Sequence, residues 1–149
     1  MVGGESHLTL SATNTCSHSG LKGCIVTNWR EELNRKRRAD GWYGCDAPDG
    51  WRKLIEETDE LLAYMDPEYK IQQVKEKFGE LRYYYESSDD VTEITKQIMD
   101  IIASNSEWQS RSICQRCGSS RYDDDVKLRG KAWVATLCVR CASGQQIEV

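Results

Sequence analysis

Two pairs of closely spaced cysteines constrain the fold of this chain more than any other feature. Two residues separate Cys114 from Cys117 and Cys138 from Cys141, and 20 residues lie between the pairs. Two intervening residues let one tight turn direct both sulfur atoms at a single ion, and four thiolates complete a tetrahedron. The spacing therefore predicts one structural Zn²⁺ with no open position for a reactive water.

Other interpretations of the cysteines fit less well. A thioredoxin-like redox site needs a single such pair in a βαβ context, and the two-plus-two spacing favours zinc over an iron–sulfur cluster. The count of 7 Cys is odd, so complete internal disulfide pairing is impossible. A second metal site is an alternative, but the irregular spacing of its ligands favours free thiols and a solvated imidazole. Those ligands would be Cys16, His18, Cys24 and Cys45.

The segment from 111 to 149 is predicted to be a separate zinc-binding module. Residues 122–130 indicate a turn and a short strand, and residues 131–137 indicate the strand that leads into the second cysteine pair. Only eight residues follow Cys141, and Gly144 interrupts them, so a treble-clef helix has little room. We expect a zinc-ribbon-like pair of knuckles on hairpins.

The preceding residues predict an α+β body over 27–110 with α-β-β-α order, after a flexible N-terminal arm over 1–26. Asn28 is a candidate N-cap for a first helix that Gly41 ends. A second helix, opening near Trp51 with Asp49 as candidate cap, has one apolar face of period 3.6. That face comprises Trp51, Leu54, Ile55, Leu61, Leu62 and Met65.

Two strands over 69–77 and 81–86 predict a hairpin in which Gly79 takes a positive φ. Tyr84 is expected on the strand face turned away from the helices. Residues 87–90 then cap a last helix whose apolar positions repeat with helical spacing. These positions are Val91, Ile94, Ile98, Ile101, Ile102 and Trp108.

Charge is unevenly divided along the chain. Residues 40–110 carry seven Lys or Arg against seventeen Asp or Glu, whereas residues 111–141 carry seven against three. The acidic body suits docking onto a basic partner surface, through the outer face of the second helix and nearby aromatic residues. The predicted binding surface comprises Glu56, Glu57, Asp59, Glu60, Trp42, Tyr43 and Tyr84.

A basic zinc module offers a second interpretation, a regulator that binds nucleic acid. Its predicted contacts are Arg116, Lys127, Arg129, Lys131 and Arg140, helped by residues 35–38. An enzyme is disfavoured, because both His lie in the N-terminal arm and no nucleophile–base spacing is evident.

The start of the chain has no basic segment followed by an apolar run, and no later stretch is long enough to cross a bilayer. We therefore expect a protein of a reducing cytosol, where paired cysteines more often hold metal than form disulfides.

The motif from Gln73 to Tyr85 contains the letters VKEKFGELRYYY, follows a Gly50-Trp51 step and precedes the cysteine pairs. Over residues 41–142 the chain resembles a group of small, largely uncharacterised phage and prophage proteins. The family often has Cys-x-x-His as its last ligand pair, whereas here Cys141 takes that place. The resemblance implies a phage-encoded protein in bacterial cytosol and implies no reaction. Because small phage proteins are often accessory or host-directed, we expect a non-enzymatic binding protein whose partner is a host or defence protein.

Overall fold

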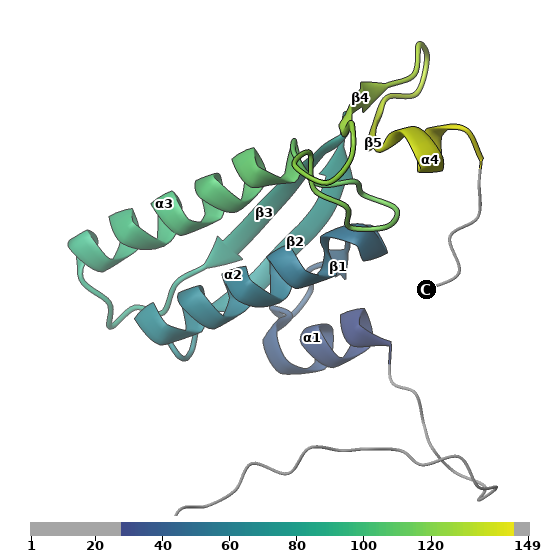
Figure 1. Ribbon diagram of the computed structural model, residues 1–149. Coiled ribbons are helices and arrows are strands. Elements are labelled where there is room, and N and C mark those ends of the chain that lie inside the picture. The colour runs from purple at the N-terminus through teal and green to yellow at the C-terminus, as the bar shows by residue number, and fades with distance from the viewer. Residues whose placement is uncertain (1–27, 145–149) are drawn as a thin grey trace, which may run out of the picture.

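The computed structural model describes residues 28–144 and has the mixed α+β architecture that the sequence predicts. Two helices, α2 (Arg52–Met65) and α3 (Glu93–Ser110), lie in front of a three-stranded sheet, and α1 (Trp29–Arg37) lies beside α2 (Figure 1). The strands of this sheet are β1 (Gly44–Asp46), β2 (Lys70–Lys77) and β3 (Glu80–Glu86). A two-stranded sheet and a short helix form the cysteine module at one end. The predicted arm, residues 1–26, with Cys16, His18 and Cys24, lies outside the described residues.

Helix α1 spans Trp29–Arg37 and begins as predicted, because the Asn28 side chain accepts a hydrogen bond from the Arg30 amide at 3.0 Å. It ends before the predicted stop at Gly41. Arg38 is already extended and pairs with Ile71, a contact between distant segments that no local signal encodes.

The segment predicted as a connector contains a strand, β1, over Gly44–Asp46. β1 pairs in parallel with β2, so the sheet order is β1-β2-β3. Asn34 of α1 holds this strand in place, since its side-chain amide accepts from the Cys45 amide and donates to the Cys45 carbonyl. Three residues are too few to show alternation, which explains why the sequence pattern missed β1.

A short 3-10 turn over Asp49–Trp51 leads into α2, which spans Arg52–Met65. The predicted inner face is largely correct, because Trp51, Leu54, Ile55 and Leu62 are all buried. Leu61 is exposed instead. The predicted cap is also wrong. Asp49 does not cap α2 but accepts a hydrogen bond from the indole of Trp29 at 2.8 Å and pairs with Arg30.

Strands β2, Lys70–Lys77, and β3, Glu80–Glu86, form the predicted antiparallel hairpin. Gly79 has φ 79°, as expected, and Phe78 also has a positive φ of 55°. Two successive positive φ angles suit a tight two-residue hairpin loop. Leu81 and Tyr83 are buried on the helix side, and Tyr84 is exposed on the open face, as predicted.

Helix α3 spans Glu93–Ser110, with Thr92 as the N-cap rather than residues 87–90. The apolar positions that repeat with helical spacing are mostly not the ones that face the core. The side turned to the sheet carries Met99, Ala103, Ser106 and Ser110, which are buried. Val91 precedes the helix and Ile102 is half-buried, whereas the other four predicted positions are exposed. These are Ile94, Ile98, Ile101 and Trp108.

Polar groups explain why this side of α3 turns inward. The β3 amides of Leu81 and Tyr83 donate to Ser110 Oγ at 3.0 Å and to Glu107 Oε1 at 2.8 Å. Edge-strand amides need such partners, and small residues let the helix approach closely enough to supply them. The demand for hydrogen bonds therefore outweighs the apolar periodicity of this helix.

Candidate metal centre

The first cysteine pair lies in a tight turn directly after α3. The Gly118 amide donates to the Cys114 carbonyl at 2.8 Å, and the Cys114 amide donates to the Ser119 carbonyl at 2.8 Å. Gly118 has φ 79°, the left-handed conformation that glycine adopts most easily. This turn matches the predicted knuckle.

The second pair is delivered by a hairpin of β4, Lys127–Arg129, and β5, Ala135–Leu137. Cys138 then caps α4, Val139–Ala142, and its sulfur accepts from the Cys141 amide at 3.4 Å. The second pair was expected on a hairpin turn; it instead opens a single helical turn. A helix start directs two side chains three positions apart to one side.

The four sulfur atoms of Cys114, Cys117, Cys138 and Cys141 lie within 4.8 Å of one another. Those of Cys117 and Cys138 are 3.7 Å apart, close to the edge of about 3.8 Å that a tetrahedron with Zn–S bonds near 2.3 Å requires. Cys117 is partly exposed and the other three are buried. The cysteines are thus positioned to bind a metal ion, and an all-thiol donor set suits zinc.

The surroundings of the thiols affect their ionisation unequally. Burial and neighbouring thiols raise the pKa of Cys141 above its ordinary value, and burial raises that of Cys138. Burial also opposes ionisation of Cys117, but hydrogen bonds from Ser119 lower its pKa to about 7. Thiolates are the ligands of zinc, so binding by Cys138 and Cys141 releases protons, and acid competes with the metal.

Cys45 is separate from this centre. It is buried in β1, and burial raises its pKa to about 11. Its environment is that of a structural, protonated thiol.

The metal centre is joined to the body through hydrogen bonds at Gly50 and Trp51. The Gly50 amide donates to the Gln115 carbonyl at 3.0 Å, and the Trp51 indole donates to the Ile113 carbonyl at 3.0 Å. On the other side, the Thr136 hydroxyl donates to the Gly79 carbonyl at 2.6 Å. No local pattern marks Thr136 as a contact residue, because its partner Gly79 lies 57 residues away in the sequence.

We expect Gly50→Ala to weaken this junction while zinc remains bound. A Cβ at residue 50 would collide with the Cys114 carbonyl oxygen and lie 2.6 Å from the Gln115 carbonyl carbon. Overpacking of this kind costs about 1–3 kcal/mol. Chemical denaturation should show the loss, and hydrogen exchange should show reduced protection of the residue 50 amide. Lys131→Ala is the control, a truncation at an exposed position of the cysteine module that should change the free energy of unfolding by less than about 0.5 kcal/mol. An unchanged free energy of unfolding would contradict the expectation.

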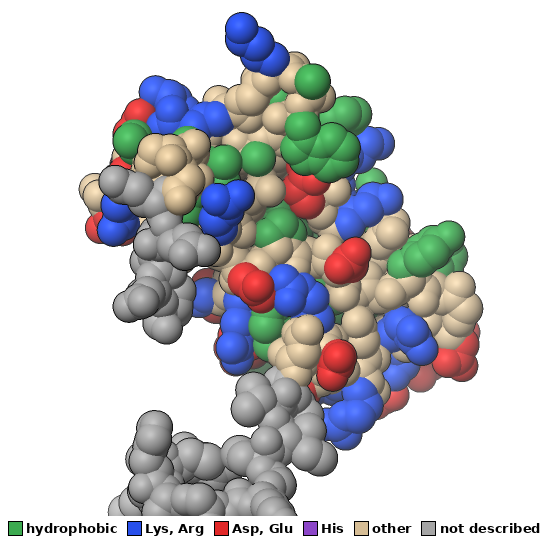
Figure 2. Space-filling view, turned by 90° about the vertical axis from the view of Figure 1, so that its right-hand side faces the viewer, with side chains coloured by type: hydrophobic (Ala, Val, Ile, Leu, Met, Phe, Trp, Pro, Cys, Tyr) green, Lys and Arg blue, Asp and Glu red, His purple; other side chains and the backbone are tan. Residues whose placement is uncertain are grey.

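Several predicted nucleic-acid contacts are paired with carboxylates of the same module. Lys127 and Arg129 pair with Asp125 at 2.8 and 3.1 Å, and Arg140 pairs with Asp124 at 3.2 Å. Arg116 and Lys131 are exposed, and Arg116 donates to the Cys141 carbonyl. Figure 2 shows this end of the molecule, where Lys and Arg side chains alternate with acidic and neutral ones.

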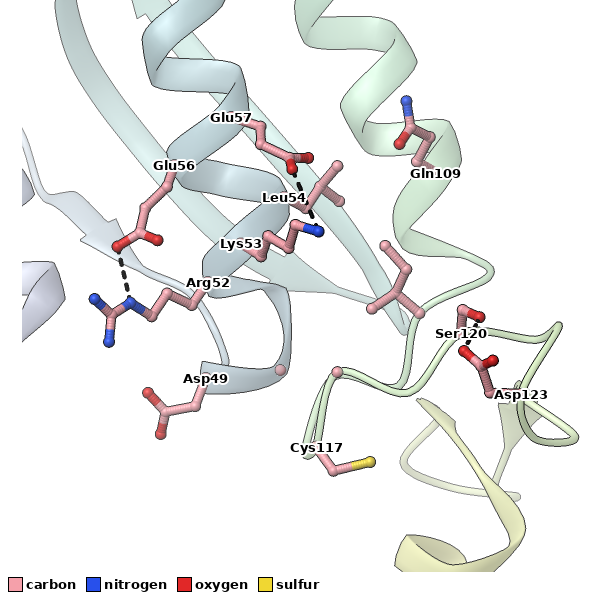
Figure 3. Close-up of a pocket in the computed structure, with 13 residues that line it drawn as sticks. Asp49, Arg52, Lys53, Leu54, Glu56, Glu57, Gln109, Cys117, Ser120 and Asp123 are labelled. Carbon is pink, nitrogen blue, oxygen red and sulfur yellow. Dashed lines mark hydrogen bonds and ion pairs between the residues drawn. The ribbon is translucent and has the colours of Figure 1, made fainter. Parts of the chain in front are cut away.

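The predicted acidic face of α2 carries less unpaired negative charge than expected, because Glu56 and Glu57 each form an ion pair within the helix. A cavity of about 670 Å³ lies beside Cys117. Among its lining residues, Glu56 pairs with Arg52 and Glu57 pairs with Lys53 (Figure 3). The cysteine sulfur points away from these pairs, towards the module.

Asp59 was predicted on the exposed binding surface, and this prediction is wrong. Its side chain is buried and accepts hydrogen bonds from Arg37 Nε at 3.0 Å and from the Tyr69 hydroxyl. Lys36 Nζ lies 3.4 Å from the same carboxylate. The cations predicted from residues 35–38 as nucleic-acid contacts thus include two that bind Asp59. The cause is tertiary, because α1 packs beside α2.

The predicted aromatic residues are all exposed. Trp42 and Tyr43 lie in the turn before β1, and Tyr84 lies on the open sheet face with Lys75 Nζ 5.9 Å from its ring centroid. Glu60 is also exposed. These residues occupy different parts of the surface rather than one patch.

Comparison with protein-family models, with curated proteins and with solved structures finds no match to this chain. No helix within residues 28–144 combines the length and apolar character needed to cross a membrane.

Proposed function

We propose that this chain is a non-enzymatic binding protein stabilised by one structural Zn²⁺. The observation that carries the proposal is the closed set of four thiols, joined to the body by the Gly50 and Trp51 hydrogen bonds. An ion held by four cysteines keeps no position for water or substrate, so its role is to hold the module in place. The function then resides in the surface that the zinc stabilises.

The surface that fits a partner best is an acidic groove between α1 and α2. It has a volume of about 370 Å³. Its carboxylates outnumber its cations by four to two, and Glu32 and Glu60 make no ion pair within the described chain. A lysine or arginine side chain of a partner protein would find unpaired carboxylates beside an aromatic wall. The groove is lined by Trp29, Glu32, Leu33, Lys36, Arg52, Glu56, Asp59 and Glu60.

Nucleic-acid binding is the weaker alternative. Four thiolates with one Zn²⁺ carry a net charge of −2, which offsets part of the excess of Lys and Arg in residues 111–141. Arg116 and the exposed Trp133 nevertheless line one cleft of about 390 Å³, a surface on which a base could stack. The phage setting, the bacterial cytosol and a host or defence protein as partner rest on the family resemblance alone.

The proposal predicts selective loss of a partner when the groove changes charge. The full chain serves as bait in a bacterial lysate, with and without nuclease. We expect Glu32→Lys combined with Glu60→Lys to reduce recovery of the captured protein by roughly tenfold, because like charges repel across an interface. Mass spectrometry identifies the protein, and its captured segment should be basic.

The control is Glu68→Lys combined with Glu86→Lys, which changes net charge equally at exposed positions outside the groove. Zinc content and melting temperature should match in all three proteins. Undiminished recovery by the groove variant would overturn the proposal. Recovery that nuclease abolishes, with binding that weakens steeply in salt, would favour the nucleic-acid alternative.

A further inference from the structure

The outward side of α3 carries an apolar seam that the core does not use. Ile94, Ile98, Ile101 and Trp108 are 70%, 40%, 67% and 56% exposed. With Asn105 they are spaced by four, three, four and three residues, the d-a-d-a-d positions of a heptad repeat. The seam spans two heptads, and apolar a and d positions are those through which one helix packs against another in a coiled coil.

A different side of α3 packs on the sheet, so the heptad spacing of the seam does not arise from packing within the chain. Four of the five b and f positions of α3, Met99, Ala103, Ser106 and Ser110, are buried against the sheet, and the fifth is Lys96 near the start of the helix. α3 therefore has two packing sides, one turned to its own sheet and one turned outward.

The distribution of charge indicates what covers the outward side. The four charged residues of α3 all occupy c or f positions, away from the seam: Glu93, Lys96, Asp100 and Glu107. The flanking e and g positions are uncharged: Thr95, Gln97, Ile102, Ser104 and Gln109. Charged e and g residues select different partners and repel identical ones, so uncharged flanks are compatible with a second copy of the same helix.

Asn105 adds an independent reason for self-association. It is exposed and stands at an a position between Ile101 and Trp108. A single Asn at an a position sets the register of a two-stranded coiled coil, because it pairs with the same Asn of the partner. In a parallel two-fold arrangement, Asn105 meets its own copy, and every isoleucine of the seam meets an isoleucine.

The neighbouring helix enlarges this surface. α2 lies beside α3 in front of the sheet (Figure 1), and its Leu61 and Tyr64 are 54% and 86% exposed. These two side chains add exposed apolar surface to the layer formed by α2 and α3.

We propose that α3 pairs with α3 of a second copy through Ile94, Ile98, Ile101, Asn105 and Trp108, making the protein a two-fold symmetric dimer. This interface is distinct from the acidic groove, which lies on the opposite flank of α2 between α1 and α2. The dimer would present two such grooves.

The test is the mass of the full, zinc-loaded chain in solution. Sedimentation equilibrium should give twice the 17.1 kDa of one chain. Ile98→Glu combined with Ile101→Glu should raise the dimer dissociation constant by roughly tenfold or more, because the symmetric contact juxtaposes like charges. The control is Trp133→Glu, which adds charge at an exposed apolar residue of the cysteine module and should leave the dimer unchanged.

Zinc content and circular dichroism establish that each variant is folded. Should the Glu variant unfold, Ile98→Gln combined with Ile101→Gln replaces it, and that variant should also dissociate. A wild-type chain that remains monomeric up to its solubility limit would overturn the proposal. So would a dimer that the seam variants leave intact, or a chain whose seam binds only a different protein.

Discussion

Replacing Cys114 by serine should remove zinc from the protein and unfold the cysteine module. We expect the zinc content to fall from about one ion per chain to nearly none, because a serine hydroxyl does not supply the thiolate that the tetrahedral site needs. Structural zinc sites contribute apparent free energies of about 10–16 kcal/mol in small metal-dependent modules, so this is the largest effect we expect. Metal analysis of the purified, reduced protein measures it directly.

Hydrogen exchange should show that the loss of structure in Cys114→Ser is centred on the cysteine module. The amides of Cys114 and Gly118, which are hydrogen-bonded in the knuckle turn, should lose protection. The β2–β3 hairpin should stay protected, because it belongs to the main sheet and is held by α2 and α3. The Trp51 indole loses its partner at Ile113, so a smaller loss of stability should reach the body.

Cys45→Ser is the matched control for this variant. It removes a buried cysteine of β1 that lies outside the four-sulfur cluster, and it should retain one zinc per chain. A Cys114→Ser protein that still holds one zinc, with its module protected, would show that the four cysteines do not form the site.

Replacing Asp59 by alanine should be the most destabilising change within the body. The carboxylate is buried and binds Arg37 and Tyr69. Its removal leaves a guanidinium that is only 11% exposed without its buried anion. Removal of one partner from a buried ion pair costs about 3–5 kcal/mol. Urea denaturation should show a loss of this size.

Two further variants test whether the loss of stability comes from this ion pair rather than from any substitution in the body. Glu60→Ala, the exposed neighbour on α2, should change stability by less than about 0.5 kcal/mol. Arg37→Ala combined with Asp59→Ala should cost less than the two single changes added together, because contacting residues are not independent. A loss below about 1 kcal/mol for Asp59→Ala would mean that the pair does not anchor α1 to α2.

The elements that could be predicted from the sequence are those whose signals are local. The hairpin from Lys70 to Glu86 follows from two β-rich runs around a glycine turn, and the inner face of α2 follows from apolar residues at helical spacing. The metal site follows from the spacing of two cysteine pairs, because that spacing sets which sulfurs one turn can direct at an ion.

The elements that were missed depend on contacts between distant residues. β1 is a strand because Asn34 and β2 hold its backbone. Asp59 is buried because α1 supplies Arg37 across the helix pair. The sequence next to β1 or next to Asp59 does not reveal these contacts. A short polar segment, or an acidic residue on a helix, is ordinarily exposed.

The sequence by itself determined the local chemistry of this protein: four thiols spaced for one ion, a glycine turn between two strands, and a helix whose apolar residues follow a heptad. Only the tertiary structure decided which way that heptad points. The amides of Leu81 and Tyr83 require hydrogen bonds at the edge of the sheet, and Ser110 and Glu107 of α3 provide them. Satisfying these amides turned the side of α3 that carries Ser106 and Ser110 inward, together with Met99 and Ala103, and left Ile94, Ile98 and Ile101 facing outward.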